Sequence, residues 1–231
     1  MRTHVLTGAA SGIGRALAER LRDRGDHLVL LLRDADRIDE LRPDFPAAVF
    51  VEADLARPRT LAGIGHHVSG PVHSLVHVAG VIALGSVGEL DVADWQHQLD
   101  VNLTAPAVLT RELLPHLRAG RGTVVFVNSG AGLSGHAGWS AYAASKFGLR
   151  GLADCLRLEE AEHGVRVTSV FPGRTGTPMQ QRVHDHEGRE YDAARFLRAD
   201  TVADAVLQVL DLPPDGTIPE IVLRTAPLPA G

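Results

Sequence analysis

The chain has 231 residues, of which 45% are hydrophobic and 22% charged, and its formal net charge is −5. This length and composition suit one globular domain with a substantial core, and the negative charge argues against nucleic-acid binding as the main task. One cysteine excludes an intrachain disulfide, and no long apolar run suggests a membrane helix or signal peptide, so we expect a cytoplasmic protein without a membrane partner.

Short apolar runs alternate with longer amphipathic stretches. In chain order we expect a strand at Val5–Leu6, a helix at Ile13–Leu21, and strands at His27–Leu32, Ala47–Val51 and Ser74–Val78. A helix at Val92–Leu117 follows, then a strand at Thr123–Val127, a helix at Ser140–His163 closed by Gly164, and a strand at Val165–Val170. A helix at Ala199–Leu210 and a strand at Ile218–Leu223 complete the series. This alternation is typical of a parallel sheet with helices on both faces.

Two segments depart from this alternation. Pro106 and Pro115 are expected to bend or shorten the long helix. Residues 172–198 carry Gly, Pro and many charges with broken helical periodicity, which is typical of an irregular functional loop, here expected at about 174–198. No linker or repeat divides the chain, so we expect a single domain over residues 1–231.

Scattered histidines and the one cysteine give weaker signals. His66–His67 and His184-x-His186 are the closest histidine pairs, and neither has an evident third ligand, so we expect no metal site. Cys155 is expected to lie in a helix without a catalytic role.

A glycine loop joins the first strand to the first helix. Its sequence is Thr7-Gly8-Ala9-Ala10-Ser11-Gly12-Ile13-Gly14. Glycines between a strand and a helix let the backbone turn tightly and approach a pyrophosphate, which rests on amides at the amino end of the helix. The context of the loop predicts a dinucleotide site.

Tyr142 and Lys146 are four residues apart in a predicted helix, thirteen residues after Ser129. Side chains at this spacing share one helix face. A nearby positive charge favours the phenolate and lowers the pKa of a tyrosine, and a serine hydroxyl can hold a substrate oxygen beside the phenol. An exposed surface Tyr and Lys is the alternative for this short pattern taken alone.

Together these motifs resemble the classical short-chain dehydrogenases/reductases. The pattern Thr-Gly-x-x-x-Gly-x-Gly, Ser, Tyr-x-x-x-Lys occurs in the family's order and spacing, and the likeness runs from about Thr3 to Leu223. The resemblance implies a single-domain Rossmann fold of the α/β class, with a doubly wound seven-stranded parallel sheet in the order 3-2-1-4-5-6-7.

The resemblance also implies a set of functional residues. The catalytic residues would be Ser129, Tyr142, Lys146 and Asn102. Cofactor contacts would come from Gly8, Ser11, Gly12, Ile13, Gly14, Arg33, Asp54, Leu55, Ala79, Gly80, Tyr142, Lys146, Pro172, Gly173, Thr175 and Thr177. In this family, the residue at Asp54 binds the adenine, and the residue at Thr177 contacts the nicotinamide carboxamide. Asp54 as a helix cap and Asn102 as a partner of buried backbone remain alternatives.

One position departs from the family pattern. Where the family shows Asn-Asn-Ala-Gly after the fourth strand, this chain has His77-Val78-Ala79-Gly80. Val78 cannot form the side-chain hydrogen bonds of asparagine, and His77 is a partial substitute at best.

Cofactor choice depends on the end of the second strand. The usual acidic position falls near the apolar Leu32, and Arg33 follows directly. An arginine there can bind a 2′-phosphate, so we expect NADP(H) to be preferred over NAD(H). The alternative is that Asp34 reaches the ribose while Arg33 points outward.

The implied activity is hydride transfer between a nicotinamide and a carbonyl or secondary alcohol. Tyr142 would exchange the proton, Lys146 would lower the pKa of Tyr142 and hold the ribose, Ser129 would orient the substrate oxygen, and Asn102 would hold a relay water. Substrate walls are expected at 131–139 and 174–198.

Two other activities remain as alternatives. One is a regulatory protein that binds a dinucleotide without turnover. The other is a sugar-nucleotide epimerase or dehydratase. Family members are usually homodimers or homotetramers, and Leu109, Leu113, Leu149, Leu152 and Leu156 could serve either that interface or the core.

Overall fold

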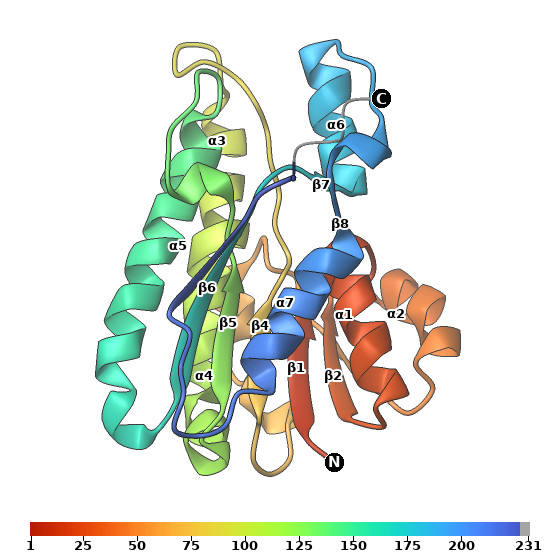
Figure 1. The fold of residues 1–231 in the computed structure, drawn as a ribbon, viewed down its shortest axis with the longest axis vertical. Coiled ribbons are helices and arrows are strands. Elements are labelled where there is room, and N and C mark those ends of the chain that lie inside the picture. The colour runs from red at the N-terminus through yellow and green to blue at the C-terminus, as the bar shows by residue number, and fades with distance from the viewer. Residues whose placement is uncertain (227–231) are drawn as a thin grey trace.

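The computed structural model describes residues 1–226, and its centre is one parallel sheet (Figure 1). Its strands are β1 (Thr3–Thr7), β2 (His27–Leu32), β3 (Val49–Glu52), β4 (Ser74–His77), β5 (Thr123–Val127), β6 (Arg166–Pro172) and β9 (Glu220–Leu223). Their order is β3-β2-β1-β4-β5-β6-β9, and every neighbouring pair is parallel. The predicted seven-stranded, doubly wound fold is therefore confirmed.

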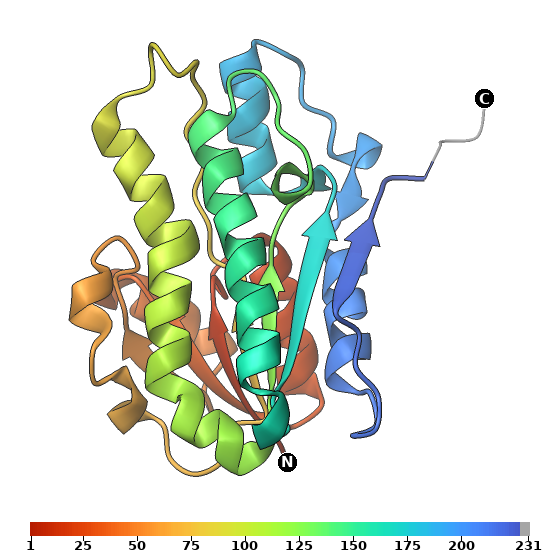
Figure 2. The same cartoon turned by 90° about the vertical axis from the view of Figure 1, so that its left-hand side faces the viewer.

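Helices cover both faces of this sheet (Figures 1 and 2). On one face lie α1 (Gly12–Asp23), α2 (Ala35–Leu41) and α7 (Ala199–Leu210), and on the other α3 (Val92–Leu99), α4 (Ala105–Gly120) and α5 (Ser140–Glu159). Strand β1 shows how the sheet supplies two cores, because Val5 packs in the cluster under α4 and α5 while Leu6 packs in the cluster under α1 and α7. A strand buried on both faces needs a continuous apolar run, which explains the predicted His27–Leu32 segment.

The long helix expected at Val92–Leu117 is interrupted. Helix α3 ends at Leu99, a π-helical turn spans Asp100–Thr104, and α4 begins at Ala105. The break thus precedes Pro106 and contains Asn102, and Pro115 lies inside α4. Such π-helical turns are frequent at functional sites.

The segment expected to be irregular is more ordered than the sequence indicated. Strands β7 (Thr175–Gly176) and β8 (Leu197–Arg198) pair with each other, and α6 (Pro178–Glu187) lies between them. Helix α6 rises above the carboxyl ends of the strands, opposite the upper ends of α3 and α5 (Figure 1). Gly188 closes α6 in the left-handed conformation, with φ of 62°.

Apolar side chains on α4 and α5 serve mainly the core. Leu109, Leu113, Leu149 and Leu156 are buried there, and Leu152 packs partly buried against them. Phe147 and Leu158 on α5 are exposed instead. Cys155 also lies exposed on α5. No helix within residues 1–226 combines the length and apolarity needed to cross a membrane.

Candidate functional site

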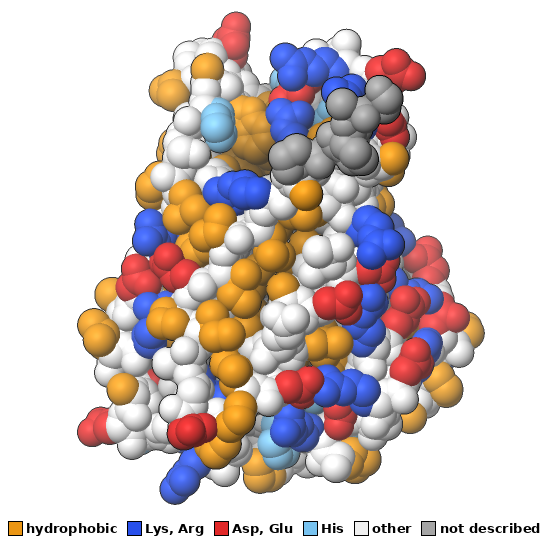
Figure 3. Space-filling model, in the orientation of Figure 1, with side chains coloured by type: hydrophobic (Ala, Val, Ile, Leu, Met, Phe, Trp, Pro, Cys, Tyr) orange, Lys and Arg blue, Asp and Glu red, His pale blue; other side chains and the backbone are white. Residues whose placement is uncertain are grey.

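A cavity of about 760 Å³ opens above the carboxyl ends of the strands. In Figure 3 it appears as a hollow near the top of the molecule, with hydrophobic side chains at its back and Lys or Arg side chains at its margin. Its walls come from the loops after β1, β4, β5 and β6, from the start of α5 and from α6. Ligands of open parallel sheets bind at this edge.

Ser129, Tyr142 and Lys146 meet in this cavity. Ser129 follows β5, and Tyr142 and Lys146 share one face of α5, where the Lys146 Nζ atom lies 5.7 Å from the centre of the Tyr142 ring. Nζ also donates to the carbonyl of Val127 at 3.2 Å. The helical spacing in the sequence thus brings a phenol, an ammonium and a hydroxyl to one point.

Burial dominates the electrostatics of these groups. Burial raises the pKa of Tyr142 above its usual value, and a hydrogen bond with Ser129 opposes that rise. Burial also lowers the pKa of Lys146 to about 8. Desolvation of the phenolate is the larger of these two effects on Tyr142, and the expectation that Lys146 lowers the pKa of Tyr142 stays a prediction. Tyr142 is a neutral phenol at pH 7, and Lys146 remains mainly protonated.

Asn102 is buried in the π-helical turn and braces the site. Its Oδ1 atom accepts from the Val81 amide at 2.8 Å, and its Nδ2 atom donates to the Val81 carbonyl at 2.9 Å and to Ser145 Oγ at 3.0 Å. A β-carbon on Gly80 would lie 3.3 Å from Asn102 Oδ1 and 3.8 Å from Lys146 Nζ. A side chain at position 80 would therefore crowd Asn102 and come into contact with Lys146.

The glycine loop has the form of a phosphate cradle. Gly8 and Gly12 have φ of 75° and 54°, and a β-carbon on Gly8 would lie 2.7 Å from the Ala79 amide nitrogen. A β-carbon on Gly14 would clash with the carbonyl oxygen of Gly8. Ser11 precedes α1 without a capping hydrogen bond from its side chain, and no acidic residue occupies the first turn. These residues fit a dinucleotide phosphate, because the amides at the start of α1 stay open to an anion.

Residues after β6 face this loop across the cavity. Thr177 caps α6 by accepting from the Gln180 amide, and its Cγ2 atom lies 3.0 Å from a β-carbon position on Gly12. Thr175 donates to the Gly173 carbonyl at 3.0 Å. The cavity brings together thirteen of the predicted site residues: Gly8, Ser11, Gly12, Ile13, Ala79, Gly80, Ser129, Tyr142, Lys146, Pro172, Gly173, Thr175 and Thr177.

Five other predicted residues do not line this cavity. Gly14 and Asn102 lie just behind it, as described above. Arg33 follows β2, Asp54 and Leu55 follow β3, and Leu55 packs partly buried against the core. Arg33 is exposed and donates to Asp34 at 2.7 Å. Asp34 also caps α2 by accepting from the Arg37 amide, so both of its carboxylate oxygens have partners within the chain.

The structure shows where His77 and Val78 lie, the two residues that replace the family's asparagines. Val78 lines the cavity, whereas His77 is buried, stacks on Phe126 and is within hydrogen-bonding distance of Thr110 at 3.0 Å. Burial lowers the pKa of His77 to about 3. His77 therefore packs in the core and does not replace the missing asparagine at the cofactor side. Thr7 Oγ1 accepts from the amides of Val78 and Ala79 instead.

The wall of the cavity around Tyr142 is both aromatic and basic. Trp139 packs edge-on against Tyr142 with ring centres 5.8 Å apart, and the guanidinium of Arg174 lies 5.9 Å from the Trp139 ring. His136 and Met179 also line the cavity, as the sequence suggested, but Leu133 does not. Sequence reasoning missed Arg224, because a lone arginine after a strand carries no pattern.

His184, which the sequence paired with His186, is buried on α6. It packs against Tyr191 and Phe196 with ring centres 5.5 and 5.2 Å away. Within residues 1–226 no group of three or more His, Cys, Asp or Glu side chains is arranged to hold a metal ion.

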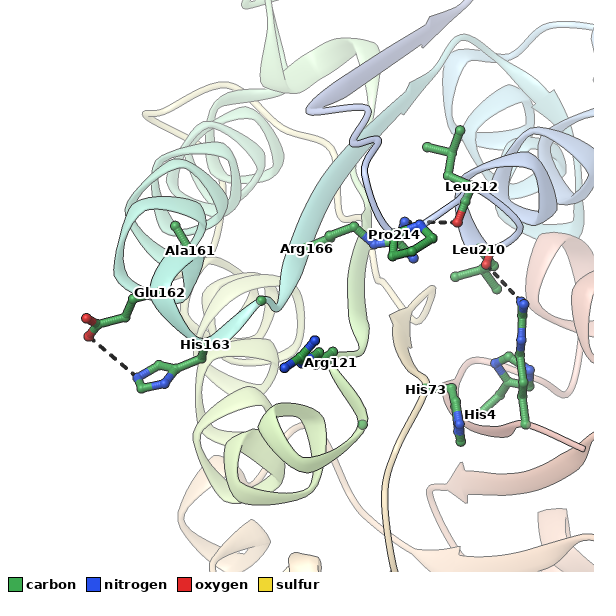
Figure 4. A pocket seen from close by; sticks show the side chains of 13 residues that line it. His4, His73, Arg121, Ala161, Glu162, His163, Arg166, Leu210, Leu212 and Pro214 are labelled. Atoms are coloured by element: carbon green, nitrogen blue, oxygen red, sulfur yellow. Dashed lines mark hydrogen bonds and ion pairs between the residues drawn. The ribbon is translucent and has the colours of Figure 1, made fainter.

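A second cavity, of about 440 Å³, lies at the opposite end of the sheet (Figure 4). Arg2 Nη1 donates to the Leu210 carbonyl and Arg166 Nη1 to the Leu212 carbonyl, each at 3.1 Å. These carbonyls lie at the carboxyl end of α7 and just beyond it, where a helix favours positive charge. The arginines of this second cavity thus stabilise a helix end.

Comparisons with known proteins agree with this geometry. The family model of the short chain dehydrogenases matches residues 2–188. An uncharacterized oxidoreductase of Staphylococcus epidermidis is 30% identical over 228 residues, which cover 95% of each chain. A glycine betaine reductase of Emericella nidulans is 32% identical over 232 residues, 95% of this chain but only 18% of that protein. A metagenomic short-chain oxidoreductase solved in complex with NADP superimposes with a TM-score of 0.82 at 29% identity, covering 97% of both chains.

Proposed function

The chain belongs to the short chain dehydrogenase family of NAD(P)-dependent oxidoreductases that act on CH–OH groups, and we propose that it interconverts a carbonyl and a secondary alcohol, with NADP(H) preferred. One observation carries this proposal. Ser129, Tyr142 and Lys146 line the same cavity as the glycine loop Gly8–Gly14. A proton donor for an alcohol oxygen and a cradle for a dinucleotide thus share one space.

Different residues would bind the dinucleotide and transfer the proton. Gly8, Gly12 and the amino end of α1 would hold the dinucleotide phosphates, and the bound nicotinamide would supply or accept the hydride. In reduction, Tyr142 donates its phenolic proton to the carbonyl oxygen, and Ser129 donates a hydrogen bond to the same oxygen. The neutral Tyr142 of the buried site suits this direction.

In oxidation, Tyr142 must first lose its proton, and the buried charge of Lys146 stabilises the phenolate. Lys146 also presents its ammonium for the ribose hydroxyls. Asn102 holds the segment around Val81 in place. We propose that it also holds a water molecule that relays protons between Lys146 and solvent.

The preference for NADP(H) rests on Arg33. The guanidinium of Arg33 is exposed, donates through Nε to Asp34, and lies at the end of β2, where a ribose phosphate would sit. A related oxidoreductase of known structure contains NADP. Because Asp34 is engaged by Arg33 and by the Arg37 amide, its capacity to bind a ribose hydroxyl is reduced.

We further propose a cytoplasmic homodimer or homotetramer of single-domain chains. The exposed Phe147 and Leu158 on α5 and Val222 on the edge strand β9 are the apolar surfaces that such an assembly would cover. Light scattering of the purified protein measures the size directly.

The central experiment is oxidation of NADPH and NADH in the presence of a panel of ketones and aldehydes. Wild-type protein should turn over with NADPH, and Tyr142→Phe should lose at least about 100-fold in kcat while keeping dinucleotide affinity. Tight dinucleotide binding without turnover of any panel member would favour the regulatory alternative. A Tyr142→Phe variant with wild-type kcat would overturn the mechanism.

A further inference from the structure

The cavity is basic although the chain is acidic. The formal net charge of the protein is −5, yet the cavity wall carries five cationic side chains and one carboxylate, Glu187. The cationic residues are Lys146, Arg174, Arg182, Arg189 and Arg224. A cleft lined by one sign of charge concentrates ligands of the opposite sign.

Part of this charge is neutralised inside the protein. Glu187 accepts two hydrogen bonds from Arg174, at 2.9 and 3.2 Å, and lies 3.6 Å from Arg189. Within residues 1–226, Arg224 and Arg182 have no carboxylate partner. Arg224 differs from Arg182 because backbone contacts hold it in place.

Arg224 is exposed, and backbone carbonyls hold one nitrogen of its guanidinium close to Gly130. Its Nη1 atom donates to the carbonyls of Phe171 and Leu223 at 3.3 and 3.1 Å. The same atom lies 3.7 Å from a β-carbon position on Gly130, the residue directly after Ser129. Because Gly130 has no side chain, the guanidinium remains uncovered on the side of the cavity.

The backbone contacts leave one edge of this guanidinium available. Nη1 is occupied by the two carbonyls, whereas Nε and Nη2 have no hydrogen-bond partner within residues 1–226. An Nε–Nη2 edge can bind a carboxylate with two parallel hydrogen bonds. Arg118 uses this edge on Glu160 in the same chain, at 2.8 and 2.7 Å.

The dinucleotide phosphates do not account for Arg224. The glycine loop follows β1, whereas Arg224 follows β9, and the sheet order places β4, β5 and β6 between these strands. Four strand spacings amount to about 19 Å. Arg224 therefore follows a strand far from the one that leads into the phosphate cradle, and it lies close to the residue after Ser129.

From this placement we propose that the substrate is a carboxylic acid, an oxo acid in reduction or a hydroxy acid in oxidation, whose carboxylate binds the Nε–Nη2 edge of Arg224. The inference rests on the proposed oxidoreductase function. In reduction the carbonyl carbon gains a hydride from the reduced nicotinamide dinucleotide and the oxygen gains a proton from Tyr142. The carboxylate keeps its charge throughout, so Arg224 binds substrate and product alike.

The test compares an oxo acid with its neutral ester. The probes are 4-oxopentanoate and methyl 4-oxopentanoate, in which the ketone is separated from the carboxyl group by two carbons. Wild-type protein should show a kcat/KM for the acid at least about 10-fold above that for the ester. Arg224→Gln should lower the value for the acid by about 10- to 100-fold and leave the ester within about threefold.

Arg198→Gln is the matched control. It makes the same charge change at the exposed residue of strand β8, which does not line the cavity, and it should leave the ratio of acid to ester unchanged. Calorimetric titration of 4-oxopentanoate gives a readout without turnover, and Arg224→Gln should weaken this binding by a similar factor.

The outcomes separate the two proposals. Turnover of the ester as efficient as that of the acid, or an unchanged ratio in Arg224→Gln, would overturn the carboxylate inference and leave the oxidoreductase function standing. Absence of turnover with both probes and with the ketone panel would overturn the function. In that case, calorimetry that detects no difference between wild type and Arg224→Gln would overturn the anion site as well.

Discussion

The side-chain amide of Asn102 donates a hydrogen bond to the hydroxyl of Ser145 at 3.0 Å. Ser145 in turn donates to the backbone carbonyl of Tyr142 at 2.7 Å. A π-helical turn between α3 and α4 is thereby tied to the helix that carries both Tyr142 and Lys146. All the side-chain atoms of this link are buried, so each unpaired member carries a desolvation penalty.

Replacement of Asn102 by alanine tests this link. The Val81 amide and carbonyl and the Ser145 hydroxyl would lose their partner, so we expect the free energy of unfolding to fall by ~3 kcal/mol and kcat to fall about 10-fold or more. Ser145→Ala is the milder comparison, because the Asn102 bonds to Val81 remain, and it should cost ~1 kcal/mol. Denaturant unfolding and steady-state kinetics measure both effects. Equal stability of Asn102→Ala and wild type would contradict the bracing role.

Arg33→Ala tests cofactor choice. The guanidinium is exposed and offers a charge-assisted hydrogen bond to a ribose phosphate, so its loss should raise the KM for NADPH by about 10-fold or more and leave the KM for NADH nearly unchanged. Arg37→Ala on the neighbouring helix α2 is the control, since Arg37 pairs with Glu40 on the surface. An unchanged ratio of the two KM values in Arg33→Ala would remove the basis for the NADP(H) preference.

We predict that a substitution at Thr177 partly restores the dinucleotide affinity that a substitution at Gly12 removes. Gly12→Ala places a methyl group at φ of 54° and 3.0 Å from Thr177 Cγ2, so dinucleotide affinity should fall about 10-fold. Thr177→Ser removes that methyl group but keeps the hydroxyl that caps α6. The double variant should regain part of the lost affinity, measured by fluorescence titration with NADPH. Strictly additive losses in the double variant would show that the two residues do not interact.

We predict that Lys146→Met is more stable than the wild type but nearly inactive. The pKa of Lys146 falls from the usual 10.5 to about 8 through burial, so the charged form costs ~3 kcal/mol in the folded state at neutral pH. Below pH 8, both the folded and the unfolded wild-type chain carry the charge, and the variant should have the higher Tm. Between pH 8 and 10.5 the folded wild type sheds the proton that its unfolded chain retains, so its stability rises and the advantage of the variant shrinks.

The measurement is Tm of both proteins from pH 6 to pH 10, with carbonyl reduction at pH 7 alongside. Activity of the variant should be nearly absent because the ammonium beside Tyr142 and the ribose is lost. A Tm gain that grows toward high pH would have the wrong sign and would contradict this explanation.

Buried strands and the helix that carries Tyr142 could be read from the sequence, because their burial leaves a physical pattern. Strand β2 is apolar from Leu28 to Leu32 since it packs on both faces, and its bounds were predicted as observed. Helix α2 was missed because only Leu41 is buried, which leaves no apolar stripe. Helix α6 was missed for a related reason, as two of its three buried residues are the polar Gln180 and His184.

Some residues of the candidate site could likewise be predicted from the sequence, and others could not. Glycine spacing and the Tyr142–Lys146 interval follow from local geometry, so residues near one another in sequence were found. The π-helical turn around Asn102 is bonded to α5, and Arg224 comes close to Gly130 because β9 pairs with β6. Contacts between distant segments leave no periodic signal in one sequence. The raised pKa of Tyr142 was also out of reach, because it depends on burial by the folded chain.

The lone exposed thiol on α5 makes the protein convenient to observe. Cys155 is the single cysteine of the chain, so a maleimide dye or spin label attaches at one position without any engineered substitution. In an assembly of two or four chains, each label would mark the same helix in every copy, and spectroscopic distances between labels would report how those helices are arranged. Chemistry that leaves the catalytic cavity untouched can thus reveal the architecture in which it operates.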